Sequence, residues 1–278
     1  MKIDKNELDK IISRALKEDI GTGDITSTLI IPRNKTAKAF LLAKEEGVIV
    51  GLPVAKAVFE KLDKNIKWRK IINEGALVSI GTKIAEVEGH YRALLTGERT
   101  ALNFLQRMSG IATITLKYVE QLHGLKTKIL DTRKTMPGLR ILDKYSVNKG
   151  TGTNHRIGLY DMIMIKDNHI KVAGSISKAV SYVKKKKYKK IKIEVETSTL
   201  EEVKEALNSG ADIIMLDNMS IKMMKEAVKI IDGKAKVEAS GGVEINSVRR
   251  IAETGVDYIS VGALTHSVKA LDIAMYFQ

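Results

Sequence analysis

The stretch IKIEVETSTLEEVKEALNSGADIIMLDN, residues 191–218, decides the fold. It contains two apolar, β-branched runs, 191–196 and 212–217, on either side of a helical pattern. Strands that are apolar on both faces are typical of a parallel sheet covered on both sides. The helical pattern ends in glycine, which is favoured just after a helix. The stretch therefore predicts a parallel strand–helix–strand unit.

This unit recurs along the chain. Further strand patterns lie at 128–132, 161–166, 236–240 and 257–262, and helical patterns separate the later ones. Repeated parallel units form either a barrel or a doubly wound sheet. Successive strands end in polar residues or glycine on the same side, which favours a barrel because its strand ends converge on one mouth. The span is too short for a complete barrel, so we predict an α/β fold with an incomplete β/α barrel of six or seven strands.

Residues 1–110 have a different pattern. A helical pattern at 5–17 leads into a glycine-punctuated loop, and extended segments with a short helical pattern follow. A long helical pattern, 91–122, comes next. We predict an N-terminal α+β domain at 1–110 and the catalytic barrel at 111–270, with the apolar last segment, 271–278, packing on the first domain.

The composition is that of an ordinary soluble protein, and 278 residues suffice for a full-sized core. The absence of cysteine excludes a disulfide scaffold and a thiolate metal site, and it fits a reducing cytoplasm. No apolar signal region opens the chain, and no run of about 18 apolar residues occurs. We therefore expect a cytoplasmic location and no membrane partner.

The net charge of +14 allows two interpretations. One is an anionic partner such as nucleic acid; the other, which we favour for most lysines, is a solvated lysine-rich surface. The run KKKKYKK at 184–190 is typical of a solvated helix end, where lysine suits the helix dipole. Aromatic residues are few and do not alternate with basic ones, so no nucleic-acid partner is expected.

Basic residues gather between 131 and 169, where apolar runs give way to polar ones. Five of them hold such positions: Arg133, Lys134, His155, Arg156 and Lys166. An uncompensated buried cation costs roughly several kcal/mol, so such charges stay together where an anion lies between them. Arginine binds carboxylates bidentately, whereas lysine and protonated histidine act as point charges. The cluster suits a substrate with more than one carboxylate.

Acidic residues end two neighbouring strands. Glu196 and Asp217 hold these positions, and Glu194 lies two residues back on the same strand face. Acids at a barrel mouth can hold Mg²⁺, bind sugar hydroxyls or stabilise a cation. Ion pairing with Lys166 or Arg133 is the alternative, and in an empty site both interpretations hold.

Glycine-containing loops, SGG at 240–242 and VGALTH at 261–266, follow the last two strands. Such loops often bind phosphate through backbone N–H groups. Either loop alone is typical of an ordinary turn, but the pair favours a phosphate site. The motifs HExxH and GxGxxG are absent, so neither a histidine-bound zinc nor a dinucleotide is expected.

Taken together, the motifs resemble the quinolinate phosphoribosyltransferase family. In chain order they are EDIGTGDITS, GERTALNFLQRMSGIAT, DTRKTMPGLR, NHRIGLYDMIMIKDNHI, IEVE, LDN, EASGG and ISVGALTHS. The resemblance covers most of the chain. It implies an α+β domain, an incomplete β/α barrel and a homodimer. It also implies Mg²⁺-assisted transfer of phosphoribose from phosphoribosyl pyrophosphate to quinolinate, with decarboxylation, to give nicotinate mononucleotide, pyrophosphate and CO₂ for NAD biosynthesis.

The resemblance also implies roles for single residues. Quinolinate would be bound by Arg133, His155, Arg156 and Lys166, with Arg99 reaching in from the neighbouring subunit. The catalytic residues, in contact with phosphoribosyl pyrophosphate and its Mg²⁺, would be Lys134, Glu196 and Asp217. The phosphate would lie among Ser240, Gly241, Gly242, Gly262 and His266. Lys144 and Lys149 are nearby cations without an assigned role.

Three alternatives stay open from the sequence. A close paralogue, such as the relatives associated with molybdenum transport, would act on another substrate. A nicotinate phosphoribosyltransferase would bind only one carboxylate, which does not call for four cations. A nucleic-acid-binding module would use 184–190 and bind with a steep salt dependence, but acids at the strand ends oppose it.

Overall fold

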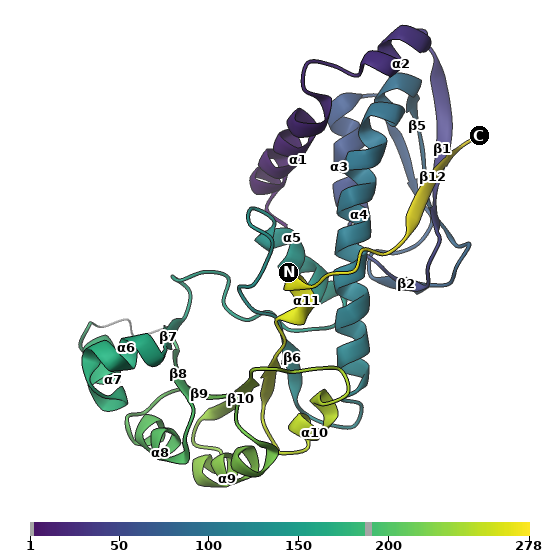
Figure 1. Ribbon diagram of the computed structural model, residues 1–278. Coiled ribbons are helices and arrows are strands. Elements are labelled where there is room, and N and C mark those ends of the chain that lie inside the picture. The colour runs from purple at the N-terminus through teal and green to yellow at the C-terminus, as the bar shows by residue number, and fades with distance from the viewer. Residues whose placement is uncertain (1–2, 187–190) are drawn as a thin grey trace. The chain divides into compact units, whose positions relative to one another are not determined.

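The computed structural model describes residues 3–186 and 191–278. The last four residues of the lysine run at 184–190 lie outside the described residues. The chain divides into two compact units (Figure 1). The first unit comprises residues 1–116, 135–151 and 264–278, and the second comprises residues 117–134 and 152–263. The predicted domain boundary near residue 110 stays a prediction.

The second unit is built on a parallel six-stranded sheet, ordered β6-β11-β10-β9-β8-β7. Its strands are β6 (Lys128–Leu130), β7 (Ile163–Ile165), β8 (Ile193–Thr197), β9 (Ile213–Asp217), β10 (Lys236–Ser240) and β11 (Tyr258–Ser260). The first strand in the sequence neighbours the last, which is the order of a barrel opened between its first two strands. A doubly wound sheet would instead reverse its order part-way. The prediction of an incomplete β/α barrel is confirmed, with six strands.

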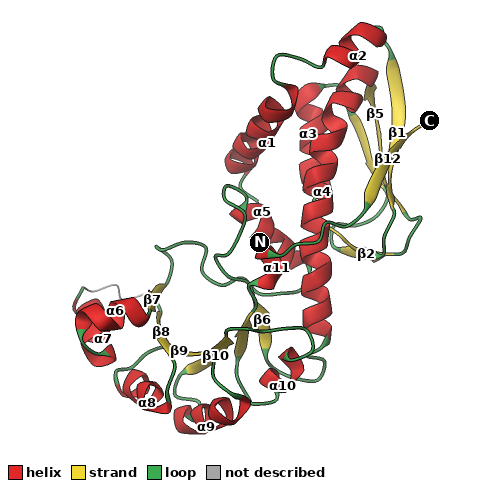
Figure 2. Ribbon diagram, viewed as in Figure 1, coloured by secondary structure: helices red, strands yellow, loops and turns green. Residues whose placement is uncertain are grey.

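Helices separate the strands of this unit and lie along the outer side of the curved sheet (Figure 2). They are α6 (Asp167–Ala173), α7 (Ile176–Lys185), α8 (Leu200–Asn208), α9 (Ile221–Ile231) and α10 (Val248–Ala252). Hydroxyl side chains begin three of them: Ser175, Thr199 and Ser220 each accept a backbone N–H of the first turn. The predicted helical patterns therefore start at ordinary N-caps.

The first unit contains a four-stranded antiparallel sheet, ordered β12-β1-β5-β3. Its strands are β1 (Thr36–Ala43), β3 (Lys67–Lys70), β5 (Lys83–His90) and β12 (Ile273–Phe277), and a separate pair joins β2 (Gly47–Ile49) to β4 (Ala76–Val78). The last segment of the chain, β12, pairs with β1 from Ala39↔Phe277 to Ala43↔Ile273. The C-terminal strand therefore completes a sheet that begins about 230 residues earlier in the sequence.

Helices complete the core of the first unit. They are α1 (Lys5–Ile20), α3 (Leu52–Leu62), α4 (Tyr91–Glu120, of which residues 91–116 belong to this unit), α5 (Arg140–Lys149) and α11 (Ala263–His266, of which residues 264–266 belong to this unit). Large apolar side chains from them, including Ile12, Phe59 and Leu105, are almost completely buried in one cluster. In the part of the chain that the structure describes, none of the helices is both long and apolar enough to cross a membrane.

A short helix replaces part of the loop expected near the N-terminus. This helix, α2 (Ile25–Ile30), begins at Asp24, whose Oδ1 accepts the N–H of Ser27 at 2.9 Å. Thr96 donates its hydroxyl to Asp24 Oδ2 at 2.8 Å. The prediction of a loop was wrong after Asp24, because a capping aspartate and a tertiary hydrogen bond stabilise a helix too short to show a periodic pattern.

The helix α4 carries a glycine where the chain returns to the first unit. A Cβ atom at Gly110 would lie 2.1 Å from the carbonyl oxygen of Lys269. No side chain fits at that distance, so only glycine lets the segment before β12 run along this helix. The segment is held there by the Leu271 N–H, which donates to the Gln106 carbonyl at 3.0 Å.

Candidate active site

The carboxyl ends of β8, β9 and β10 carry three of the predicted site residues: Glu196, Asp217 and Ser240. Asp217 and Ser240 are paired in the register of the sheet. Asn218, which follows Asp217, has a left-handed backbone (φ 52°) and donates its N–H to the Ser240 carbonyl at 2.9 Å. Neighbouring parallel strands therefore place a carboxylate and a serine at the same edge, where a barrel binds its substrates.

The turn after β10 requires glycine. Gly241 has φ +94°, and a Cβ atom there would lie 2.2 Å from Asn218 Oδ1. Gly242 also has a positive φ, +57°, with open space around it. The backbone of the SGG loop is thus pressed against the residue that follows Asp217. A larger residue at Gly241 would displace this turn.

Lys166 lies at the start of α6 and forms an ion pair with Glu196. Its backbone N–H donates to His169 Nδ1 at 2.9 Å, which fixes the first turn of the helix. The Glu196 side chain is 16% exposed and that of Lys166 is 43% exposed. The pairing considered in the sequence analysis is therefore present. It compensates both charges, and an anionic ligand would have to draw Lys166 away from Glu196.

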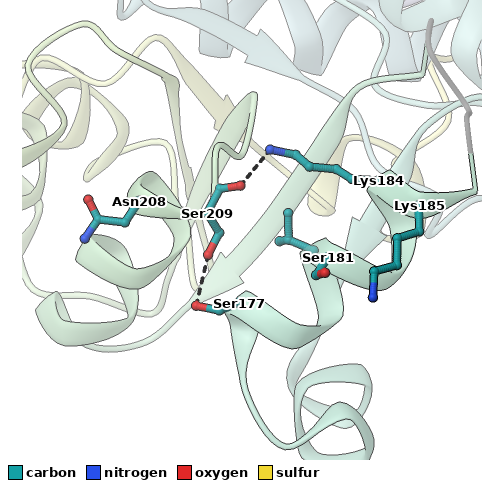
Figure 3. Close-up of a pocket in the computed structure, with 7 residues that line it drawn as sticks. Ser177, Ser181, Lys184, Lys185, Asn208 and Ser209 are labelled. Carbon is teal, nitrogen blue, oxygen red and sulfur yellow. Dashed lines mark hydrogen bonds between the residues drawn. The ribbon is translucent and has the colours of Figure 1, made fainter.

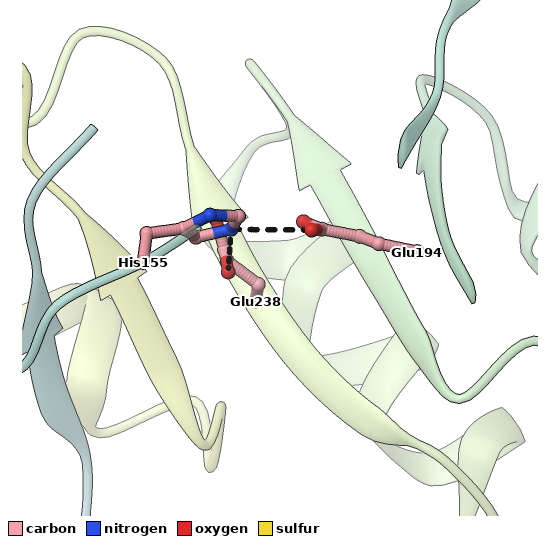
Figure 4. Close-up of side chains that lie close together, drawn as sticks. All are labelled: His155, Glu194 and Glu238. Atoms are coloured by element: carbon pink, nitrogen blue, oxygen red, sulfur yellow. Dashed lines mark ion pairs between the residues drawn. The ribbon is translucent and has the colours of Figure 1, made fainter. Parts of the chain in front are cut away.

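His155 is enclosed by two buried carboxylates (Figure 4). Its Nε2 lies 3.1 Å from Glu194 Oε2 and 3.4 Å from Glu238 Oε2, and both acids are completely buried. The other ring nitrogen, Nδ1, accepts the N–H of Arg156 at 2.7 Å. The backbone N–H of His155 donates to Asp131 Oδ1 at 2.8 Å. Both ring nitrogens and the main chain of His155 are thus engaged within the protein.

The two acids change the protonation of this cluster. Burial alone would lower the pKa of His155, but the carboxylates of Glu194 and Glu238 beside Nε2 outweigh it and raise that pKa to about 9. Burial raises the pKa of Glu194, and repulsion by Glu238 adds to the rise, while His155 opposes it. A raised pKa favours the imidazolium form of His155, in which both ring nitrogens carry a proton. A second proton on Nδ1 would require the Arg156 N–H to turn away.

Two arginines meet in the same unit. Arg156 donates from Nη1 to the Met162 carbonyl at 3.1 Å and contacts Met164 Sδ from Nη2 at 3.4 Å. Burial lowers the pKa of Arg156, and the charge of Arg133 lowers it further. Among the described residues, the buried Nε of Arg133 has no hydrogen-bond partner. Two mutually repelling guanidinium groups, one with an unsatisfied buried donor, indicate an anion site between them.

Two sets of side chains could hold a metal ion. His155, Glu194 and Glu238 each offer one ligand atom, and these atoms lie within 4.8 Å of one another. Glu196 and Asp217 offer carboxylates at the open strand ends, where Asp217 Oδ2 also accepts from Asn218 Nδ2 at 2.8 Å. Mg²⁺ prefers oxygen ligands and keeps several waters, so the strand-end carboxylates fit it better than the enclosed set with its imidazole.

The remaining predicted residues lie on separate segments. Lys134 is exposed, and its N–H donates to Thr132 Oγ1 at 3.0 Å. Gly262 lies two residues after the end of β11. Arg99 is exposed on α4 in the first unit. His266 ends α11, also in the first unit, with Nδ1 2.6 Å from Ser267 Oγ. Their roles stay predictions.

Two buried acids, Glu238 and Asp131, have a part in the site that the sequence patterns did not predict. Glu238 lies in the middle of β10, and its Oε1 accepts the hydroxyl of Ser260 at 2.6 Å. Asp131 follows β6 and accepts from both Asn154 Nδ2, at 2.6 Å, and the His155 N–H. The available signal was a single acid within or directly after an apolar strand, because a buried carboxylate there needs a partner.

A surface pocket lies apart from these strand ends, between α7 and α8 (Figure 3). Lys184 Nζ donates to the Ser209 carbonyl at 2.7 Å, and the hydroxyls of Ser209 and Ser177 are 3.1 Å apart. Lysine at the carbonyl end of a helix is favourable because of the helix dipole. The first lysine of the run at 184–190 thus caps α8.

A parallel barrel-like sheet with clustered cations and carboxylates at its strand ends defines a β/α-barrel enzyme for anionic substrates. Residues 24–109 match the family model for the N-terminal domain of quinolinate phosphoribosyl transferase, and residues 111–276 match that for its C-terminal domain. The chain belongs to the quinolinate phosphoribosyl transferase family.

Proteins that are similar to almost the whole chain also belong to this family by name. The probable nicotinate-nucleotide pyrophosphorylase (carboxylating) of Bacillus subtilis is 46% identical over 269 residues, covering 97% of this chain and 93% of that protein. Mitochondrial quinolinate phosphoribosyltransferase (decarboxylating) 2b of Nicotiana tabacum is 45% identical over 289 residues, covering 97% and 82%. The crystal structure of NadC from Streptococcus pyogenes has a TM-score of 0.96 at 40% identity and covers 100% of this chain and 99% of its own. Human nicotinic acid phosphoribosyltransferase shares only the fold, with a TM-score of 0.63 at 12% identity.

Proposed function

We propose that the chain transfers phosphoribose from phosphoribosyl pyrophosphate to the ring nitrogen of quinolinate, with loss of CO₂, to give nicotinate mononucleotide for NAD biosynthesis. Membership of the family supports this pentosyl transfer. The observation that carries it in this chain is the pair Arg133 and Arg156, which repel each other while a buried donor of Arg133 stays unsatisfied. A dicarboxylate placed between them would satisfy both groups.

Quinolinate binding would use the charges around these arginines. Arg156 is held by the Met162 carbonyl and would offer its remaining donors to one carboxylate. Arg133 would use the unsatisfied Nε for the same or the second carboxylate. Lys166 would leave Glu196 for the ligand, which frees Glu196 for the second substrate. His155 lies next to Arg156 and would add positive potential when its ring is protonated.

Phosphoribosyl pyrophosphate would lie along the ends of β8 to β11. Glu196 and Asp217 fit Mg²⁺, which when bound neutralises charge on the leaving pyrophosphate. Lys134 would contact the pyrophosphate as a further cation. The turns that include Ser240, Gly241, Gly242, Gly262 and His266 would contact the phosphate through backbone and side-chain donors.

The chemistry then follows from charge placement. The bond from C1 to pyrophosphate breaks ahead of nitrogen attack, so the sugar acquires oxocarbenium character, and Glu196 and Asp217 stabilise that positive charge. Arg133 and Arg156 hold the ring with its nitrogen facing C1, which removes the entropy cost of orientation. The 2-carboxylate leaves as CO₂, the electrons of the broken bond stay on C2, where the adjacent quaternised nitrogen stabilises them, and C2 then takes a proton from solvent. No general base is required.

Two further features belong to the proposal. We infer a homodimer in which Arg99 of each subunit reaches the site of its neighbour, because Arg99 is an exposed cation on α4 with no acidic partner in the described part of the chain apart from the charge of Glu98. We also expect a cytoplasmic location. Curated plant relatives are mitochondrial or chloroplastic, so the compartment differs among relatives.

The test measures quinolinate consumption and CO₂ release with phosphoribosyl pyrophosphate and Mg²⁺. Wild type should consume quinolinate with one CO₂ per turnover and should not accept nicotinate. Arg133→Ala should lower kcat/KM for quinolinate by about a hundredfold or more, since a bidentate charged contact is lost. Arg250→Ala, which removes an exposed arginine of α10, is the matched control and should leave turnover unchanged.

Other outcomes separate the alternatives. A folded wild type that leaves quinolinate untouched would favour a paralogue with another substrate. Turnover of nicotinate without CO₂ would favour a nicotinate phosphoribosyltransferase. Turnover that is indifferent to Arg133 would retain the reaction and reject the proposed anion site.

A further inference from the structure

We propose that Glu194 and Glu238 are positioning residues for quinolinate: through the Nε2–H of His155 they fix the His155–Arg156 peptide and thereby the guanidinium of Arg156. This inference rests on the proposed function, since it concerns the same substrate. It assigns a role to two buried acids that do not themselves reach the strand ends.

The two acids form a layer beneath the strand-end groups. Glu194 precedes Glu196 by two residues on β8, and Glu238 precedes Ser240 by two on β10. Because side chains alternate along a strand, each pair shares one face. Glu194 and Glu238 are completely buried, whereas the Glu196 side chain is 16% exposed. The lower layer is therefore closed off from the solvent that the upper layer meets.

These acids are costly for the fold. In the described part of the chain, the ion-pair partner of both Glu194 and Glu238 is the same residue, His155. Glu194 Oε1 has no hydrogen-bond partner there, although it is buried. Two buried carboxylates around one imidazole are less favourable than apolar side chains of similar volume would be. Stability alone does not account for the arrangement, which points to a role in the site.

The hydrogen bonds around His155 show what the acids hold. Nδ1 accepts the Arg156 N–H, so in this geometry the ring proton is on Nε2, which faces Glu194 and Glu238. The His155 N–H is bound by Asp131, and Glu238 is itself fixed by the Ser260 hydroxyl. The backbone N–H groups of both His155 and Arg156 are thereby held in place.

Arg156 is the functional end of this chain of contacts. Its main-chain N–H is bound by the His155 ring, and its guanidinium by the Met162 carbonyl on the segment before β7. If the ring turned, the Arg156 N–H would lose its acceptor, and the main chain from which the Arg156 side chain extends would no longer be fixed. Loss of the acids should therefore weaken quinolinate binding more than phosphoribosyl pyrophosphate binding.

The test compares Glu194→Gln, Glu238→Gln and the double variant with Glu226→Gln, the same change on the exposed face of α9. KM for both substrates and kcat are measured for each folded variant. The double variant should raise KM for quinolinate about tenfold or more, while KM for phosphoribosyl pyrophosphate stays within about twofold. A parallel rise of both KM values, or an unchanged KM for quinolinate, would overturn the proposal.

A second measurement covers variants that fail to fold. In wild type with ¹⁵N-labelled histidine, and with His155→Gln to assign the signal, the His155 ring should carry its proton on Nε2. That proton should exchange more slowly than those of the exposed His123. An unprotonated Nε2, or exchange as fast as at His123, would reject the assignment. This readout needs no substrate, so it stays informative even if wild type does not act on quinolinate.

Discussion

Some charged side chains of the second unit have all of their polar contacts within the protein, whereas others do not. Lys166 pairs with Glu196, and His155 lies between two acids, but Arg133 keeps a buried donor without a partner among the described residues. A buried unsatisfied donor costs about 1–3 kcal/mol, and a ligand that accepts its hydrogen bond recovers that cost as binding free energy. Partial satisfaction thus gives affinity for an anion.

Gly241 allows a test of the proposed phosphate loop. Gly241→Ala would place Cβ 2.2 Å from Asn218 Oδ1 on a left-handed backbone. The turn beside Asp217 should shift, and KM for phosphoribosyl pyrophosphate should rise about tenfold while KM for quinolinate changes little. Steady-state kinetics with each substrate varied in turn measures this.

The matched control is Gly233→Ala, which has a similar φ of +71° but open space around the Cβ position. It carries the same backbone strain after α9 without touching the strand ends. An equal effect of both substitutions would mean that backbone strain, and not a displaced loop at the strand ends, raises KM for phosphoribosyl pyrophosphate.

The helices and strands differ in how far the sequence alone predicts them. Strands β8 to β10 are apolar, β-branched runs between capped helices, so their pattern is local and the sequence reveals it. The helix α2 has six residues, which is less than two turns, and its start depends on Asp24 and Thr96, which are far apart in the chain. No local period can reveal such a helix.

The site residues also differ in how far the sequence alone predicts them. Glu196 and Asp217 could be predicted because the end of a strand is visible in the sequence. The pairing of His155 with Glu194 and Glu238 joins residues about 40 and 80 positions apart, and it depends on which strands are neighbours. A single acid in an apolar strand indicates that a partner exists but does not identify it.

Asp63, the C-cap of α3, gives a prediction for one element of the first unit. It accepts the N–H groups of Asn65, at 2.8 Å, and His90, at 2.9 Å, and it pairs with the His90 ring. Burial would raise the pKa of Asp63, but these hydrogen bonds outweigh it and lower that pKa. A lowered folded-state pKa stabilises the protein above the unfolded value of about 4, and this stabilisation is lost as the pH falls through the folded value.

At pH 7, Asp63→Asn should therefore lower the free energy of unfolding by about 1–3 kcal/mol, and the difference from wild type should shrink as the pH falls below about 4. Urea unfolding followed by the fluorescence of Trp68, the single tryptophan, reports on this unit because Trp68 lies in β3. Asp9→Asn, at an exposed ion pair with Lys61, should change little. A difference that persists undiminished at pH 3 would contradict the role of the Asp63 charge.

The whole molecule carries a net charge of +14, which attracts two polyanionic substrates from a distance. The exposed lysines contribute to this general attraction, which salt screens over about 8–10 Å. The half-buried Arg133 and Arg156 act at contact distance and are screened much less. Raised ionic strength should therefore slow substrate capture without removing selectivity for a dicarboxylate.

The proposed homodimer gives the last prediction. If Arg99 acts in the neighbouring site, Arg99→Ala and Arg133→Ala should each lose nearly all activity alone, but a hybrid dimer of the two has one intact site. Random pairing at equal amounts makes about half of the dimers hybrid, so co-expression should restore about a quarter of the wild-type activity. Arg133→Ala co-expressed with Arg156→Ala should restore nothing, because both arginines belong to one unit and each site of the hybrid dimer therefore lacks one of them. If Arg99 instead acts within its own subunit, each hybrid site carries one defect and no activity returns.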